Sequence, residues 1–337
     1  MINLLSIRII IGLAVILCLI LNFGCKNDPE QVVFMAGFRA QANLPFVAAY
    51  VAKEKGYFSQ QGLNVDIKHA STGEHLKLLL SGDVDFTTAA ATSVLKRRSS
   101  PGLPVVAFAL FGQQSQQAYV ALKDSGINSP KDWEGRKFGY KISVPPDYLA
   151  ILEQNEVDRS KIDEIKVGFD PRILIQGKVD VLAVFNSNEP DTIRNLGFDV
   201  NTWESDDYGV PNLGLTYIAT QDMLDSNPQM IERFLKASIK AVEYIKNNRE
   251  ETLDIVMKYA PDQNREHQQF MLNTELNDSE NELTLKHGFG WMSDNQWYNL
   301  YEMLIKFEAL PERFDYKTAF TTKFLGEIYS DGSLIWP

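Results

Sequence analysis

Cysteine is nearly absent from this sequence, since its 337 residues include two, Cys18 and Cys25. Cys18 lies inside an apolar run from Ile9 to Phe23, which is short for a helix that must cross a bilayer with roughly 20 residues. Such a run is typical of a cleaved export signal, and cleavage would remove Cys18. The remaining chain could then form no internal disulfide, and it would hold no cysteine-based metal site or catalytic thiol.

Positive charge is also scarce, because 33 lysines and arginines face 44 acidic residues and the net charge is −11. This balance argues against nucleic acid as a partner. The sequence has no P-loop, no glycine-rich dinucleotide fingerprint and no nucleophile elbow. His69 and His75 lie six residues apart around Glu74, which is more typical of a solvated loop than of a metal site. We therefore expect no metal and no cofactor.

The N-terminal segment predicts an extracytoplasmic protein. The apolar run ends at Gly24 and Cys25, where a small residue before a cysteine resembles the lipobox of bacterial lipoproteins. Asn22 occupies the place that is usually leucine, so the match is imperfect. We predict a signal peptide over 1–24, an acylated Cys25 and a tether over 25–30 that holds the chain at the cell membrane or its periplasmic face. An uncleaved membrane anchor is the alternative.

Past the tether, predicted strands and helices alternate. About 310 residues remain, which is enough for two lobes. The predicted strands are 32–38, 63–68, 84–86 and 105–110, and the predicted helices are 45–55, 73–80 and 91–98. This alternation predicts an α/β lobe with a largely parallel sheet.

The same pattern restarts at Ser129, which can cap a short helix with Pro130 in its first turn. A strand over 137–141, a helix over 146–154 and a strand near Lys166 follow. The second set predicts a second, smaller α/β lobe.

One motif occurs once in each predicted lobe. The segments LLLSGDVDFTTA and ILIQGKVDVLAV both run from a helix end through glycine, one residue and Val-Asp into an apolar strand. Glycine suits a left-handed helix cap and valine suits the start of a strand. The repeat supports a duplicated architecture.

Polar residues interrupt the pattern where the predicted strands end. In an open parallel sheet, ligands bind beyond the carboxyl ends of the strands. The interruptions are 39–43, 87–92 and 113–116 in the first lobe, and 140–147 and 185–189 in the second. We expect these segments to line one cleft.

Four segments carry a resemblance to a known family: LPFVAAYVAKEKGYFSQQGLNVDI, SGDVDF, SPKDWEGRKFGY and NPQMIERFLKASIKAVEYIKNN. They look like the substrate-binding proteins of ABC importers of the nitrate, sulfonate and taurine type, in the branch that also contains the thiamine-pyrimidine synthases. The resemblance covers nearly all of the chain after the tether. It implies a type II periplasmic-binding-protein fold, in which two α/β lobes joined by two hinge strands close over a ligand.

The resemblance also implies how the lobes divide. Lobe 1 is expected to be discontinuous, 31–117 plus 218–337, and lobe 2 to span 118–217. The crossing strands are expected over 117–123 and 213–220.

Two function classes follow from the resemblance, a transport binding protein and an enzyme. The related synthases hold pyridoxal phosphate on a lysine, with a histidine four residues on and a cysteine-rich run on the return crossing. In this sequence Ala89 and Ser93 stand at those two positions, and GLTY replaces the cysteines. We therefore predict a binding protein that is not an enzyme.

The segment VFNSNEPD is the clearest candidate for ligand contact. Phe185 ends an apolar strand and Asn186 and Glu189 follow it, a combination of ring and polar groups that suits a planar polar heterocycle. Asn188 could equally cap a helix that contains Pro190. The predicted ligand-binding residues come from both lobes: Phe38, Arg39, Gln41, Asn43, Phe46, Thr88, Gln113, Tyr140, Asp147, Phe185, Asn186, Glu189 and Tyr217.

The charge of this set bears on the ligand. A small anion would need a concentration of arginines, whereas the set offers Arg39 with Lys141 nearby. The resemblance is greatest to riboflavin-binding members, with a thiamine pyrimidine precursor as the second choice and a sulfonate or similar small anion as the alternative. It also implies an ABC permease and its ATPase as partners.

Overall fold

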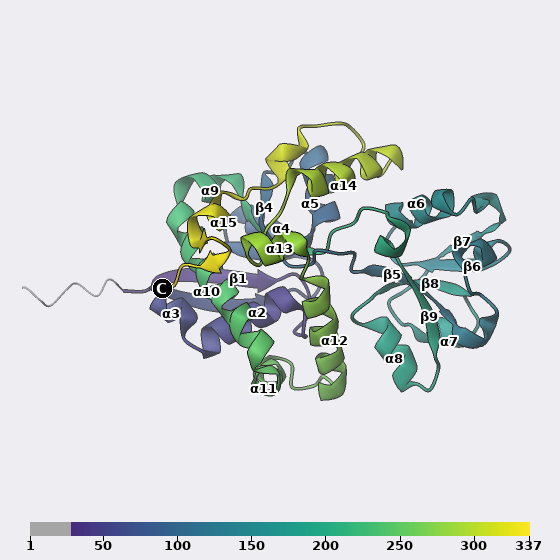
Figure 1. The fold of residues 1–337 in the computed structure, drawn as a ribbon, viewed down its shortest axis with the longest axis horizontal. Coiled ribbons are helices and arrows are strands. Elements are labelled where there is room, and N and C mark those ends of the chain that lie inside the picture. The colour runs from purple at the N-terminus through teal and green to yellow at the C-terminus, as the bar shows by residue number, and fades with distance from the viewer. Residues whose placement is uncertain (1–27) are drawn as a thin grey trace, which may run out of the picture.

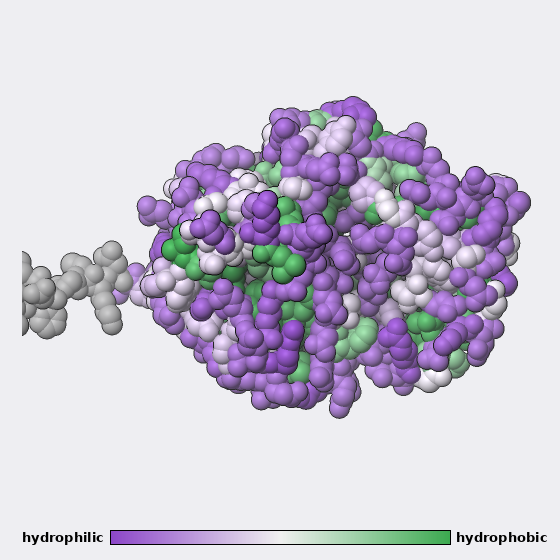
Figure 2. Space-filling model, in the orientation of Figure 1, coloured by the Kyte–Doolittle hydropathy of each residue, from purple (hydrophilic) through white to green (hydrophobic). Residues whose placement is uncertain are grey.

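A computed structural model of the protein describes residues 28–337. The predicted signal peptide, 1–24, and the predicted lipidation site, Cys25, lie outside these residues. The described chain forms two lobes side by side, joined at the centre of the molecule (Figure 1). Within 28–337 no helix is long and apolar enough to span a bilayer. The face of the molecule seen in Figure 2 is mostly hydrophilic, and hydrophobic residues gather on it in small patches.

Lobe 1 is built on a five-stranded sheet in the order β2-β1-β3-β10-β4. Its strands are β1 (Glu30–Ala36), β2 (Leu63–His69), β3 (Phe86–Ala90), β4 (Val105–Leu110) and β10 (Leu215–Thr220). β1, β2 and β3 pair in parallel, and β10 lies antiparallel between β3 and β4. β4 therefore runs in the same direction as the first three strands.

Helices cover lobe 1. Those from the first half of the chain are α2 (Leu44–Glu54), α3 (Tyr57–Gln60), α4 (His75–Ser81) and α5 (Ala91–Ser99). Those from the C-terminal part are α9 (Gln221–Ser226), α10 (Pro228–Asn247), α11 (Arg249–Tyr259), α12 (Arg265–Asp278), α13 (Glu282–His287), α14 (Asp294–Lys306) and α15 (Lys323–Ile328), followed by a hairpin of β11 (Tyr329–Ser330) and β12 (Ser333–Leu334).

Lobe 2 has its own five-stranded sheet in the order β7-β6-β8-β5-β9. Its elements are β5 (Gln117–Leu122), β6 (Lys137–Tyr140), α6 (Pro146–Gln154), β7 (Asp163–Lys166), α7 (Arg172–Ile175), β8 (Val181–Phe185), α8 (Glu189–Asn195) and β9 (Val200–Glu204). β5 is antiparallel to its neighbours β8 and β9, and β6, β7 and β8 are parallel. Ser129 and Asp132 form a capping box on the short helix Pro130–Trp133, as the sequence predicts.

The repeated Gly-x-Val-Asp motif has the same structure in both lobes. Gly82 and Gly177 adopt left-handed conformations, with φ of 80° and 65°, and end α4 and α7 as predicted. The aspartate, which directly precedes the strand, then accepts a hydrogen bond from the backbone of the neighbouring strand. Asp85 Oδ2 accepts a hydrogen bond from Val33 N at 2.7 Å, and Asp180 Oδ2 accepts one from Lys137 N at 2.9 Å.

This arrangement corrects one strand boundary. The strand expected over 84–86 spans Phe86–Ala90, because Asp83 and Val84 still donate hydrogen bonds to Leu78 O at the end of α4. The residues around Gly82 thus belong to the helix cap, and the strand begins only after Asp85.

Both connections between the sheets join carboxyl edge to carboxyl edge. β4 ends at the carboxyl edge of the lobe 1 sheet, and the antiparallel β5 begins at the carboxyl edge of the lobe 2 sheet. The second connection runs from the end of β9 to the start of the antiparallel β10. The carboxyl edges of the two sheets therefore meet at the crossover segments, 111–116 and 205–214.

The crossings differ from the expected positions. The segments 117–123 and 213–220 provide strands that belong to one sheet each, β5 and β10, and the irregular segments before them cross between lobes. The two crossovers touch: Gly214 N donates to Gly112 O at 2.9 Å. A Cβ on Gly112 would lie 2.8 Å from Gly214 Cα, so this close approach requires glycine.

The core of lobe 1 depends on the C-terminal helices. Apolar residues recur at helical spacing along α10, and Ile231, Phe234 and Leu235 are buried with the rest of that face. The Phe234 ring stacks on Phe58 with 5.2 Å between ring centroids and packs on Phe86 at 4.6 Å. Burial of such a ring stabilises the fold by about 1.5–3 kcal/mol.

Candidate functional site

The candidate site lies where the two carboxyl edges face each other. On the lobe 1 side the chain leaves β1 at Gly37, whose N–H donates to Thr88 Oγ1 at 3.0 Å. A Cβ on Gly37 would lie 2.8 Å from the same oxygen. The predicted site residue Thr88 is buried and fixes the start of the loop 37–43 against the end of β3.

Two further predicted residues, Gln41 and Asn43, are buried in a hydrogen-bonded chain. Gln41 Nε2 donates to Asn43 Oδ1 at 2.6 Å, and Asn43 Nδ2 donates to Glu275 Oε1 on α12. Leu44 N donates to the other carboxylate oxygen of Glu275 at 2.6 Å. Both amides thus position the first turn of α2 against α12.

Glu275 also connects this chain to lobe 2, because Ser187 Oγ donates to its Oε1 at 3.1 Å. Its side chain is almost completely buried. Burial raises the pKa of Glu275 to about 7, and the hydrogen bonds from Leu44 and Asn43 oppose that rise. The carboxyl group can therefore exist in either protonation state near neutral pH.

Gln113, also predicted, anchors the first crossover. Its Nε2 donates to Trp291 O at 2.9 Å, and its Oε1 accepts hydrogen bonds from Asn281 Nδ2 at 2.9 Å and Gln296 Nε2 at 3.0 Å. Its own N–H donates to Asp278 O at 2.8 Å. The side chain is buried and its partners are all protein groups.

Asp147 lies buried in the first turn of α6. Its Oδ2 accepts a hydrogen bond from Ser205 Oγ at 2.8 Å, at the start of the second crossover. Burial raises the pKa of Asp147. The carboxylate thus links α6 to the crossover.

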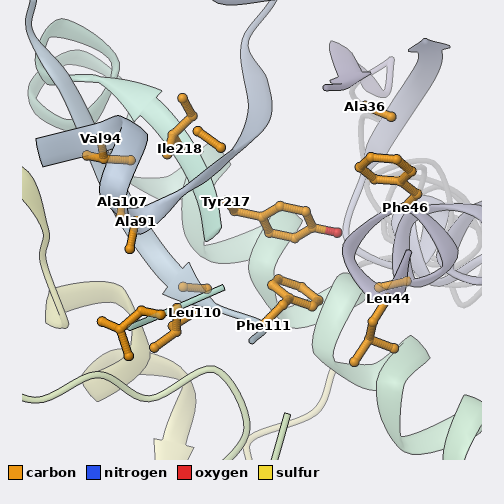
Figure 3. Packing of buried hydrophobic residues seen from close by; sticks show 14 of the residues in the cluster. Ala36, Leu44, Phe46, Ala91, Val94, Ala107, Leu110, Phe111, Tyr217 and Ile218 are labelled. Atoms are coloured by element: carbon orange, nitrogen blue, oxygen red, sulfur yellow. The ribbon is translucent and has the colours of Figure 1, made fainter. Parts of the chain in front are cut away.

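The rings of Phe46 and Tyr217 occupy the core of lobe 1. Both are buried, and Figure 3 shows Tyr217 pointing between Phe46 and Phe111. Its hydroxyl donates to Pro45 O at 2.6 Å, and its ring centroid lies 4.4 Å from that of Phe111. These two predicted ligand-binding rings are engaged in core packing, since α10 and α2 enclose the inner face of the sheet.

The edge of lobe 2 is more open. Phe185, Asn186 and Tyr140 are each partly buried. Asn186 Nδ2 donates to Glu204 Oε1 at 2.9 Å, and within 28–337 its Oδ1 accepts no hydrogen bond. A ring and an unoccupied amide oxygen therefore stand together at the end of β8.

Glu189 is paired with the nearest cation. It forms a salt bridge with Lys141, and its Oε2 accepts a hydrogen bond from Phe185 N at 2.8 Å. Both side chains are largely buried, 6% and 16% exposed. The pair cancels the positive charge that an anionic ligand would need from Lys141.

Three exposed apolar side chains lie on loops at the carboxyl edges. Phe38 follows β1 and is 44% exposed, Ile142 follows β6 and is 76% exposed, and Phe169 follows β7 and is 65% exposed. Arg39 is exposed and lies over the Phe38 ring, 5.6 Å from its centroid. Such side chains at the rim suit a partly apolar ligand.

A cavity of about 510 Å³ opens between the lobes beside this edge. It is lined by Arg39, Gln41, Asn188, Thr192, Asn195, Leu196, Gln263, Asn264, Glu266 and His267. His267 on α12 lies 2.7 Å from Asp191 Oδ2 and 2.9 Å from Asn188 Oδ1, both on the α8 side. The Asn188 side chain accepts no capping hydrogen bond from α8, and its Oδ1 contacts His267 on α12 instead.

Sequence reasoning missed the acidic residues of α12 and β9. Glu275 and Asp278 come from a polar helix far along the chain, and Glu204 ends β9. Nothing in a sequence distinguishes a buried helical acid from a solvated one, so only the return of α12 to the lobe boundary (Figure 1) identifies them. Within 28–337, no cluster of histidine, cysteine and acidic residues has the geometry to hold a metal ion.

Comparison with known proteins gives a family and a fold. The family described as NMT1/THI5 like matches residues 43–252. The aliphatic sulphonate-binding protein SsuA of Escherichia coli has a similar structure, with a TM-score of 0.65 and 14% identity over 86% of this chain and 91% of that one. This likeness confirms the predicted periplasmic-binding-protein fold of two α/β lobes.

Three curated relatives differ in what their names describe. The riboflavin-binding protein RibY of Chloroflexus aurantiacus is 26% identical over 84% of this chain and 83% of its own. The formylaminopyrimidine-binding protein of Halalkalibacterium halodurans is 26% identical over 62% of this chain and 64% of its own. A 4-amino-5-hydroxymethyl-2-methylpyrimidine phosphate synthase of Schizosaccharomyces pombe is 25% identical over 62% of this chain and 63% of its own. The matched region spans less than two thirds of the last two proteins.

Proposed function

Because this chain belongs to the NMT1/THI5-like family, we propose that it is an extracytoplasmic solute-binding lipoprotein of an ABC importer. It captures a vitamin-type aromatic heterocycle between its two lobes and delivers it to a permease with its ATPase. Riboflavin is the first candidate, in line with the similarity to RibY over most of both chains, and a thiamine pyrimidine precursor is the second.

The observation that carries this proposal is the open edge of lobe 2. Phe185 offers a partly buried ring, and Asn186 keeps an amide oxygen without a protein donor in the described chain. From lobe 1, the exposed Phe38 ring comes from the loop that lines the same inter-lobe cavity through Arg39 and Gln41. A ring from each lobe and an amide at the end of β8 suit a flat ring with carbonyl and N–H groups at its edge.

The charge of the site favours an uncharged ring over a sulfonate. Lys141 is paired with Glu189 in a largely buried salt bridge, and Arg39 is exposed to solvent. Anion sites concentrate guanidinium groups and helix-start amides. Four buried residues of lobe 1 hold its loops in place through their hydrogen bonds, and we assign them positioning roles: Gln41, Asn43, Thr88 and Gln113.

An enzyme of the pyrimidine-synthase kind is the alternative. Against it stands the position of Ala89, a buried methyl side chain whose backbone oxygen accepts a hydrogen bond from Thr216 Oγ1 at 2.8 Å. It carries no amine for a covalent cofactor link. Incubation with pyridoxal phosphate and iron should yield no pyrimidine product, and formation of that product would restore the enzyme hypothesis.

The ligand assignment is tested by titrating the purified chain with riboflavin and following flavin fluorescence. We expect quenching, because a flavin stacked on aromatic rings loses emission. Asn186→Ala should weaken binding by about 1–3 kcal/mol, since a buried ligand group loses its partner. Asn64→Ala is the matched control, because Asn64 is an exposed amide near the start of β2, at the amino edge of the lobe 1 sheet.

Other outcomes of the same titration are decisive. Unchanged flavin fluorescence together with thermal stabilisation by an aminopyrimidine would favour the second ligand. Stabilisation by a sulfonate alone would contradict the proposal that the charge of the site favours an uncharged ring.

The lipoprotein assignment has its own test. We expect Cys25→Ser, expressed in a bacterial host, to leave the membrane fraction and appear in the soluble fraction. A variant that stays with the membrane like the parent would contradict acylation at Cys25.

A further inference from the structure

Three carboxyl groups from both lobes meet beside the proposed site. Glu275 and Asp278 lie one turn apart on α12, and Glu204 ends β9 in lobe 2. We refer to Glu204, Glu275 and Asp278 as the acidic trio.

Each member of the acidic trio is fixed by contacts next to the site. Glu204 Oε1 accepts the hydrogen bond from Asn186 Nδ2 at 2.9 Å, and Glu275 Oε1 accepts one from Ser187 Oγ at 3.1 Å. Asp278 accepts a hydrogen bond from Gln113 N through its backbone oxygen at 2.8 Å. The trio therefore borders the segment 185–189 and the first crossover.

Asp278 is the member of the acidic trio whose side chain can accept a further hydrogen bond. Its side chain is 7% exposed, and its Oδ2 is buried without a hydrogen-bond donor in residues 28–337. Burial, followed by the negative charges of Glu204 and Glu275, raises the pKa of Asp278 to about 8. The three groups thus influence one another across the lobe boundary.

Little positive charge opposes the acidic trio. Among the described residues, Lys141 is paired with Glu189, Arg39 is exposed over Phe38, and the partly buried Lys96 interacts with Asp147. A like charge brought into a site of low dielectric is strongly disfavoured. A ligand that carries a phosphate would therefore meet repulsion that its uncharged form does not.

We propose that the acidic trio makes this site select against anionic ligands, so that it accepts riboflavin and rejects the phosphorylated flavin, FMN. This inference rests on the proposed function and adds a specificity determinant to it. Glu204 is its central residue, because it contacts Asn186 directly. The selection acts on the charge of the ligand, since the isoalloxazine ring of the two flavins is the same.

The test compares riboflavin and FMN as probes of the same full chain by fluorescence titration at about pH 8.5, where a phosphate with a second pKa of about 6 carries two charges. We expect the wild type to bind FMN at least tenfold more weakly than riboflavin. Glu204→Gln, which keeps an oxygen for Asn186, should lower the ratio of the dissociation constant for FMN to that for riboflavin severalfold. Asp278→Asn should also lower this ratio. Two variants on different lobes protect the test against a folding defect in either.

Glu153→Gln is the matched control, because Glu153 is an exposed acid on α6 that pairs with Lys306. It should leave the ratio unchanged. Equal affinity of the wild type for both flavins, or an unchanged ratio in both trio variants, would overturn this inference while the proposed function stands. Failure of the wild type to bind either flavin would overturn the riboflavin assignment and this inference with it.

Discussion

The two lobes are built alike at the amino edge of their sheets and differently at the carboxyl edge. At the amino edge, Asp85 and Asp180 each hold the neighbouring strand through the same side-chain hydrogen bond. At the carboxyl edge, the lobe 1 amides of Gln41, Asn43 and Gln113 are buried among protein partners. The corresponding residues of lobe 2, Tyr140, Phe185 and Asn186, are partly open.

The difference comes from what the chain does after the second crossover. The C-terminal helices return to lobe 1 (Figure 1) and supply partners for its edge, among them Glu275 on α12 and Asn281 before α13. Lobe 2 receives less of this cover, because α12 reaches its edge at Ser187, Asn188 and Asp191 and leaves Tyr140, Phe185 and Asn186 partly exposed. Similar polar residues after a strand therefore support structure in one lobe and are available to a ligand in the other.

The largest effect on stability is expected from removing the side chain of Gln113, which is buried at the carboxyl edge of lobe 1. Gln113→Ala leaves partly buried groups of Trp291, Asn281 and Gln296 without this partner, and we expect a loss of about 3 kcal/mol in the free energy of unfolding. Urea denaturation followed by circular dichroism measures it. Gln154→Ala, at an exposed position at the end of α6, should change stability by less than about 0.5 kcal/mol. Equal effects of the two substitutions would contradict a structural role for Gln113.

The second prediction concerns Glu275 and pH. Since burial raises its pKa from 4.5 to about 7, the folded state holds a proton that the unfolded chain has released. The free energy of unfolding should therefore fall as pH rises from about 4.5 to about 7, by about 3 kcal/mol from this group. Urea midpoints at several pH values measure this slope.

Glu275→Gln provides the control for that slope, because an amide stays neutral throughout the range. The variant should lose about half of the decline between about pH 5 and 7, because Asp278, whose pKa is raised from 3.8 to about 8, contributes a decline of similar slope from about pH 4 to about pH 8. A variant with the same slope as the wild type would show that Glu275 is ionised in the folded state.

The smallest effects should come from the amino edges, where the lobes are alike. Asp85→Ala removes a partly buried hydrogen bond and Asp180→Ala an exposed one, and each should cost about 1 kcal/mol of stability or less. Neither should change riboflavin affinity, because both lie at the edge away from the crossovers. A loss of affinity in either variant would mean that ligand binding depends on more than the carboxyl edges.

The sequence was sufficient for features that depend on neighbouring residues. The alternating pattern, the left-handed Gly82 and Gly177, and the capping box of Ser129 are local consequences of residue type, and all three are confirmed. The apolar face of α10 follows from helical spacing alone.

Features that depend on distant segments could not be predicted in this way. Phe46 and Tyr217 are predicted to stack on a ligand, yet α2 and α10 bury both rings in the core of lobe 1. Glu275 and Asp278 resemble solvated helical acids until α12 brings them to the lobe boundary. The crossovers were misplaced because strand residues at 117–123 and 213–220 carry no mark of which sheet they join.

The central claim is that one ligand contacts the carboxyl edges of both lobes, and riboflavin titration of three variants tests it most directly. Phe38→Ala in lobe 1 should weaken binding by about 0.5–1.5 kcal/mol through lost stacking, and Asn186→Ala in lobe 2 by about 1–3 kcal/mol. Phe198→Ala should bind like the wild type, because Phe198 is similarly exposed, 41% against 44% for Phe38, but lies before β9 at the amino edge. Weakening by only one of the two site variants, or by Phe198→Ala to the same extent, would contradict a ligand held between the lobes.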